Sequence, residues 1–128
     1  MAVAGANPKV QALVEFYGGV PTIVERPITR LPPTFILHGE ADEVVPVQEA
    51  YALEDFVQTR APSYAMKLYP GAPHGFDFEL SGANSVDAKQ RVVAFFAAHL
   101  HVPASSTNRY SSPLALPATA TDVCRSCQ

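Results

Sequence analysis

A segment with helical periodicity lies between two short apolar segments, and this order constrains the fold more than any other feature of the sequence. The apolar segments are 34–38 and 64–69, and both are bounded by Pro or Gly, which is typical of buried strands. Between them, residues 47–60 carry apolar side chains on one helical face, behind a proline that the start of a helix tolerates. A strand, a helix and a strand in succession join parallel strands of one sheet. We therefore expect an α/β fold.

Two further segments extend this pattern on either side. Residues 10–17 are rich in β-branched and aromatic side chains and end at two glycines, which predicts another strand. Residues 87–100 have the periodicity of a helix that begins near Asp87, a charge suited to the positive end of a helix. Its apolar stripe consists of Ala88, Val92, Phe95, Phe96 and Leu100. The sequence thus predicts three parallel strands with crossover helices.

The predicted sheet has few helices to cover its two faces, although parallel sheets are normally buried on both. Residues 1–8 have the pattern of a helix end, closed by Gly5 and Pro8, without the preceding part of the helix. We therefore expect residues 1–102 to form the C-terminal part of a larger domain. Residues 103–128 are dominated by Ser, Thr, Ala and Pro and have almost no large apolar side chains, so we expect a disordered tail.

Charge and cysteine content exclude several functional classes. With nine Lys and Arg and a net charge of −3, the chain lacks the basic surface that binds nucleic acid. The longest apolar run, 92–98, is too short to span a bilayer, and residues 1–4 do not resemble a secretory signal, so we expect a cytoplasmic protein. Cys124 and Cys127 lack both the other ligands of a zinc site and the flanking elements of a redox pair. Their role stays open, and we expect neither a metal nor a cofactor.

Polar side chains follow two of the predicted strands. Asp42 follows the strand 34–38, and His74 follows the strand 64–69. Ligands bind beyond the carboxyl ends of parallel strands, so both side chains are expected at one edge of the sheet. An aspartate that binds an imidazole fixes its tautomer and stabilises its cation, while the other ring nitrogen accepts a proton from a nucleophile. Tyr17 and Phe76 are candidates to bind substrate, although core packing explains them equally well.

The patterns around these residues resemble those of the dienelactone hydrolases, a family of α/β-hydrolases. Residues 39–46 read Gly-x-x-Asp-x-x-Val-Pro, residues 69–76 read Tyr-Pro-Gly-Ala-x-His-Gly-Phe, and residues 16–19 read Phe-Tyr-Gly-Gly. The resemblance covers about residues 1–102 and corresponds to the C-terminal half of such a domain. It implies that Asp42 is the catalytic acid and His74 the catalytic base of a nucleophile–His–Asp triad. The implied substrate is a small-molecule ester or lactone, with no cofactor.

The nucleophile of that triad is missing from the sequence. No Gly-x-Ser-x-Gly, nor its Cys version, occurs in the chain, so we expect this elbow before residue 1 and no esterase activity from the chain alone. Ser63 and Ser81 do not follow a strand at the start of a helix and are poor substitutes. Two alternatives remain open. One is a non-catalytic half-domain that pairs with another copy, or with a separate N-terminal half, through the open edge of strand 10–17. The other is a truncated product without function.

Overall fold

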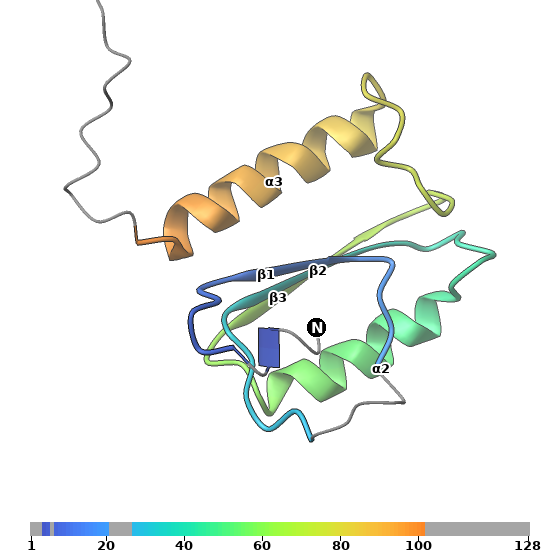
Figure 1. Ribbon diagram of the computed structural model, residues 1–128. Coiled ribbons are helices and arrows are strands. Elements are labelled where there is room, and N and C mark those ends of the chain that lie inside the picture. Colours follow the sequence, from blue (N-terminus) through green and yellow to red (C-terminus); the bar gives the residue numbers. More distant parts are fainter. Residues whose placement is uncertain (1–3, 6, 21–26, 102–128) are drawn as a thin grey trace, which may run out of the picture.

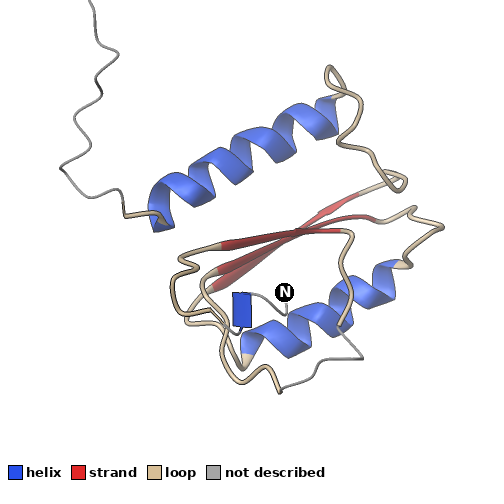
Figure 2. Cartoon of the chain, viewed as in Figure 1, coloured by secondary structure: helices blue, strands red, loops and turns tan. Residues whose placement is uncertain are grey.

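Three parallel strands form the centre of the molecule. The computed structural model describes residues 4–5, 7–20 and 27–101. The strands lie in the order β1 (Leu13–Phe16), β2 (Thr34–Gly39) and β3 (Tyr64–Tyr69), and both strand pairs are parallel. Figure 2 shows that the loops following the three strands lie at the same end of the sheet. The predicted α/β class with three parallel strands is confirmed.

Two long helices cover opposite faces of this sheet. Helix α2 (Val47–Gln58) connects β2 to β3, and helix α3 (Ala83–His99) follows β3. In Figure 1, α2 lies below the sheet and α3 lies above it. Residues 4–5 are also helical, while the remainder of the expected helix end at 1–8 contributes no described helix. Because α2 connects the parallel strands β2 and β3, the crossover that defines the α/β class is present.

Each face of the sheet has its own apolar core, and β2 contributes to both. All six residues of β2 are buried, because it is the central strand. Its side chains alternate between faces, so Ile36 packs on the α2 side while Phe35 and Leu37 pack on the α3 side. The α2 core contains Ile28, Leu31, Ile36, Ala50, Leu53 and Val57. The α3 core contains Phe35, Leu37, Tyr69, Ala72, Phe76 and Ala88.

The boundaries of two elements differ from those expected. Helix α3 begins at Ala83, ahead of the expected start near Asp87, because Ser85 in its first turn is buried and donates to the carbonyl of Asp77 at 2.9 Å. The end of the expected stripe is also wrong, since Leu100 lies outside the helix and is 45% exposed. Strand β1 is shorter than the expected segment 10–17. The expected tail, 103–128, lies outside the described residues.

Strand β1 forms one edge of the sheet. In the described part of the chain it pairs with β2 on one side and with no strand on the other. Its four residues are all half-buried, in contrast to the fully buried β2. No helix within the described ranges is long and apolar enough to cross a bilayer.

Candidate active site

The structure brings Asp42 and His74 into direct contact. Asp42 lies in the turn after β2 and His74 in the loop after β3, and the His74 Nδ1 atom is 2.8 Å from Asp42 Oδ2. The two loops are joined by backbone hydrogen bonds, in which Glu40 donates to the Tyr69 carbonyl and Ala41 to the Ala72 carbonyl. The expectation that both side chains lie at one edge of the sheet is therefore met by the geometry.

Glycine at position 39 permits this close approach. A Cβ atom at Gly39 would lie 2.2 Å from the carbonyl oxygen of Ala72, closer than any real contact. Because the obstacle is backbone and not a movable side chain, a larger residue would push the two loops apart. Gly39 thus sets the separation of the segments that carry Asp42 and His74.

Asp42 is held by its own turn as well as by His74. Its Oδ1 atom accepts hydrogen bonds from the backbone amides of Val44 and Val45, at 2.9 and 2.8 Å, and the residue is 6% exposed. Burial raises the pKa of this carboxyl, but the hydrogen bonds from Val45, His74 and Val44 outweigh burial and hold the pKa below its ordinary value. Asp42 is therefore ionised at neutral pH, with Oδ2 directed to His74.

A second histidine, His38, forms a hydrogen bond to the same turn. Its side chain is fully buried at the end of β2, and Nε2 lies 2.8 Å from the carbonyl oxygen of Val45 and 3.6 Å from Asp42 Oδ2. Because a carbonyl only accepts, Nε2 must donate to it, and Nδ1 has no partner among the described residues. His38 thus packs in the interior at a strand end, and its contact with the Asp42 turn had no signal in the sequence.

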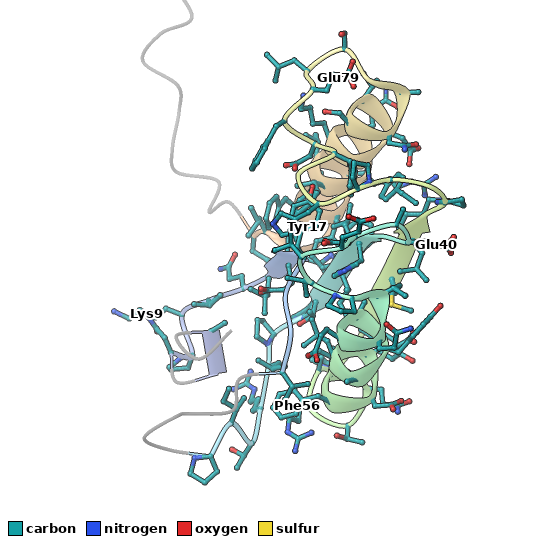
Figure 3. All side chains as sticks on the ribbon, turned by 90° about the vertical axis from the view of Figure 1, so that its right-hand side faces the viewer. Lys9, Tyr17, Glu40, Phe56 and Glu79 are labelled. Atoms are coloured by element: carbon teal, nitrogen blue, oxygen red, sulfur yellow. The ribbon has the colours of Figure 1, made fainter. Side chains whose placement is uncertain are left out.

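Tyr17 lies directly against the imidazole of His74. The ring centroids are 4.6 Å apart, and the Tyr17 hydroxyl donates to Asp77 Oδ1. Burial and this bond to Asp77 raise the pKa of the Tyr17 phenol above its ordinary value. Figure 3 shows Tyr17 among the crowded side chains near the sheet, whereas Glu79 projects from the outer part of the loop before α3. The candidates Tyr17, Asp42 and His74 therefore form one cluster.

Phe76 has a different environment from Tyr17. It is 7% exposed, and its ring packs against Tyr69 at a centroid distance of 4.6 Å and against Tyr17 at 5.6 Å. This burial leaves little of its surface for contact with a substrate. The role of Phe76 in the core is visible here, and its substrate-binding role stays a prediction.

The second ring nitrogen of His74 is available for chemistry. The His74 side chain is 36% exposed, and its Nε2 atom makes no hydrogen bond within the described part of the chain. Ser63 and Ser81 are both exposed, and neither bonds to His74. Over the described ranges, no three His, Cys, Asp or Glu side chains gather in a way that could hold a metal ion. The arrangement can accept a proton at Nε2 while Asp42 stabilises the resulting imidazolium.

Comparison with known proteins agrees with this geometry. The model of the dienelactone hydrolase family matches residues 1–100. The chain belongs to the dienelactone hydrolase family. Among curated relatives, a carboxymethylenebutenolidase homolog of Xenopus tropicalis is 30% identical over 70 residues, which are 54% of this chain and 28% of that protein. The non-reducing polyketide synthase ausA of Emericella nidulans is 34% identical over 61 residues, which are 48% of this chain and 2% of that synthase.

Solved structures show the same fold. A protein assigned to the dienelactone hydrolases from Klebsiella pneumoniae superposes with a TM-score of 0.58 and 22% identity, covering 75% of this chain and 45% of that one. A protein of unknown function from Agrobacterium tumefaciens, assigned to the α/β-hydrolases, has a TM-score of 0.56 and 17% identity, covering 80% of this chain and 48% of that one. This dienelactone hydrolase family member therefore has a partial α/β-hydrolase fold and spans less than half of either neighbour.

Proposed function

We propose that this chain supplies the acid and the base of an ester or lactone hydrolase. The observation that supports the proposal is the 2.8 Å contact between His74 Nδ1 and Asp42 Oδ2. The side chain is 36% exposed, and its opposite ring nitrogen bonds to none of the residues that the structure describes. An ionised carboxylate on one ring nitrogen and an accessible second nitrogen are what a general base of acyl transfer requires. Membership of the dienelactone hydrolase family adds the ester or lactone as substrate class.

The proposed reaction is a two-step acyl transfer. His74 Nε2 takes the proton of a Ser hydroxyl or Cys thiol as that group attacks the acyl carbon. The ester C–O bond then breaks, and the proton passes from Nε2 to the leaving oxygen. In the second step Nε2 takes a proton from water as the water oxygen attacks the acyl carbon. The bond between the acyl carbon and the nucleophile then breaks, Nε2 returns the proton to the nucleophile oxygen or sulfur, and the carboxylic acid leaves. Asp42 keeps Nδ1 protonated and stabilises the imidazolium in both steps.

The nucleophile belongs to polypeptide outside this sequence under the proposal, because the chain contains no Gly-x-Ser-x-Gly or Gly-x-Cys-x-Gly. We therefore expect the isolated chain to hydrolyse nitrophenyl acetate no faster than buffer. The matched control is His74→Ala, which should give the same background rate. Turnover by the wild-type chain that disappears in His74→Ala would show that the chain holds its own nucleophile.

The positive test uses the nucleotide sequence upstream of the Met1 codon. We expect an in-frame Gly-x-Ser-x-Gly or Gly-x-Cys-x-Gly there, and the longer reading frame should hydrolyse esters. Within that longer protein, His74→Ala should lower kcat by several orders of magnitude, as loss of a triad base does. Full activity after this substitution would reject the proposal.

The cytoplasmic location stays a prediction, which cell fractionation would test.

A second candidate function is association without catalysis, and exposed apolar side chains along α3 and directly after it favour this function. Val86, Val93 and Leu100 recur along this segment and are 40%, 68% and 45% exposed. In the described part of the chain, the outer edge of β1 has no strand partner, so a strand of another chain could pair with it and extend the sheet. Sedimentation of the full chain would reveal a dimer or larger species that Val93→Lys disperses. A sharp monomeric boundary together with a cooperative melt would count against association.

A further inference from the structure

Asp77, three residues after His74, is fixed to the rest of the molecule at three atoms. Its carboxylate accepts the Tyr17 hydroxyl, and its backbone amide donates to the same phenol oxygen at 3.3 Å. Its carbonyl accepts the buried Ser85 hydroxyl at 2.9 Å. The loop that carries His74 is therefore attached both to the end of β1 and to the first turn of α3.

The backbone of Tyr17 is adapted to this contact. Tyr17 has a φ of +55°, and among the described residues it is the one non-glycine with a positive φ. L-residues adopt this left-handed region at an energetic cost, so such a conformation persists where surrounding contacts enforce it. With this backbone conformation, the Tyr17 ring lies against His74 and the hydroxyl bonds to Asp77.

His74 is consequently held on two sides. Asp42 binds one edge of the imidazole at Nδ1, and the Tyr17 ring lies against it with an interplanar angle of 44°. The hydrogen bond to Asp42 fixes one atom and leaves the ring free to swing about it. The neighbouring Tyr17 ring restricts that swing, because the phenol is itself anchored at Asp77.

We propose that Tyr17 is a positioning residue for His74, acting through a clamp formed by its hydroxyl and both the carboxylate and the amide of Asp77. The clamp holds the His74 loop so that Nδ1 stays on Asp42 and Nε2 stays on the exposed side. Its catalytic meaning rests on the proposed function of His74 as base. The clamp assigns the Tyr17 hydroxyl to Asp77, so a substrate would meet the ring of Tyr17 and not its hydroxyl.

Tyr69 provides a matched control within the same chain. Its hydroxyl also donates to an aspartate, Asp87, at 3.0 Å, and it too lies at the end of a strand. Its ring packs against Phe76 rather than His74. Tyr17→Phe and Tyr69→Phe thus each remove one phenol–carboxylate bond, and only the first bond is part of the clamp.

The experiment follows the imidazole Nδ1–H proton of His74 by nuclear magnetic resonance in the full ¹⁵N-labelled chain, with the signal assigned by its absence in His74→Gln. We expect its exchange with water to accelerate about tenfold in Tyr17→Phe, which is the effect of losing a hydrogen bond to a charged group. In Tyr69→Phe we expect a change of less than about twofold, because the lost hydroxyl bonds to Asp87 on α3 and not to the loop that carries His74. Equal rates in wild type and Tyr17→Phe would overturn the clamp, and so would equal acceleration in both variants.

Asp77→Asn keeps the test decisive if Tyr17→Phe does not fold. The amide oxygen of the new asparagine still accepts the Tyr17 hydroxyl, but it carries no charge. We therefore expect the His74 Nδ1–H proton to exchange faster than in wild type and more slowly than in Tyr17→Phe. An unchanged rate in a folded Asp77→Asn would then reject the clamp. The readout is independent of hydrolysis. A longer reading frame without esterase activity rejects the proposed function and leaves the exchange contrast intact, while unchanged exchange in an active enzyme rejects the clamp alone.

Discussion

Asp42 uses its two carboxylate oxygens for different tasks. Oδ1 accepts two backbone amides of its own turn, and Oδ2 accepts Nδ1 of His74. Because the turn fills Oδ1, the carboxylate cannot rotate to offer His74 the other oxygen without breaking both amide bonds. The orientation of the acid is therefore set before His74 arrives, and the i+2 and i+3 amides that set it belong to the Asp-x-x-Val pattern itself.

The low pKa of Asp42 predicts a loss of stability in acid. Its folded pKa lies below the ordinary value of 3.8, so in the interval between the two values the unfolded chain binds more protons than the folded one. The stabilising contribution is complete above about pH 4 and disappears as pH falls through the folded pKa. Urea unfolding from about pH 6 down to about pH 3 should show a smaller acid-dependent loss in Asp42→Asn than in wild type.

Asp87→Asn is the control for this acid effect. Asp87 also has a lowered pKa, chiefly through its hydrogen bond to Arg91, but it lies on the surface where solvent screens the charge. We expect Asp87→Asn to retain most of the acid dependence of the wild type. An acid profile in Asp42→Asn that matches the wild type would show that Asp42 is not the group responsible.

The raised pKa values of Tyr17 and Tyr69 predict a loss of stability at high pH. Burial, and after it the bonds to Asp77 and Asp87, raise the pKa of both phenols above the ordinary 10.0. The stability that this gives is complete below about pH 10 and is lost as pH rises, because the unfolded phenols ionise first. Titration of tyrosinate absorbance should therefore contain phenols that ionise only as the chain unfolds. Each Tyr→Phe substitution should remove one of them; phenols that titrate freely in the folded chain would contradict this.

At the scale of elements, the contact between the β2 and β3 loops governs the site. Gly39→Ala would place a methyl group against the Ala72 carbonyl, and the backbone shift should destabilise the fold by about 1–3 kcal/mol. It should also weaken the Nδ1–H signal of His74, because Asp42 and His74 move apart. Chemical unfolding and the same resonance measurement test both effects.

Gly71→Ala is the companion substitution in the β3 loop. Gly71 has a φ of +67°, and a Cβ atom at this position would meet no other atom within 4 Å. The substitution therefore introduces backbone strain of about 1 kcal/mol without a clash. We expect the Nδ1–H signal of His74 to persist there. Loss of the signal in Gly71→Ala and its retention in Gly39→Ala would contradict the spacing role of Gly39.

Elements were predictable where their signals are local. Turn residues bound β2 and β3, and α2 shows its period within its own residues, so their order and approximate limits follow from the sequence. The start of α3 depends on Ser85 reaching the Asp77 carbonyl, which is a tertiary contact. The same applies inside the site: Asp42 and His74 stand in recognisable patterns, but the Tyr17–Asp77 bond joins residues 60 apart and no local pattern encodes it.

At the scale of the whole molecule, helix α2 buries larger apolar side chains than helix α3 does. Helix α2 buries Ala50, Leu53 and Val57, while α3 buries only Ser85 and Ala88 among its residues. We therefore expect Leu53→Ala to lower the free energy of unfolding by about 2–5 kcal/mol. Leu80→Ala, at a leucine that is 77% exposed, should change it by less than about 0.5 kcal/mol. Similar effects of both substitutions in urea unfolding would show that the burial of Leu53 against the sheet does not stabilise the fold.

The crossover from β2 through α2 to β3 has a practical consequence. Asp42, His74 and the helix that links their strands come from one uninterrupted stretch of chain, and the hydrogen bond between the two side chains joins residues of that stretch. Under the proposed function, a hydrolase of this architecture can be divided ahead of β1 so that one piece carries the proton-transfer pair and the other carries the nucleophile. Each piece would be inactive alone, and ester hydrolysis would show that the two pieces have associated. The chain is thus a natural starting point for a split-enzyme sensor.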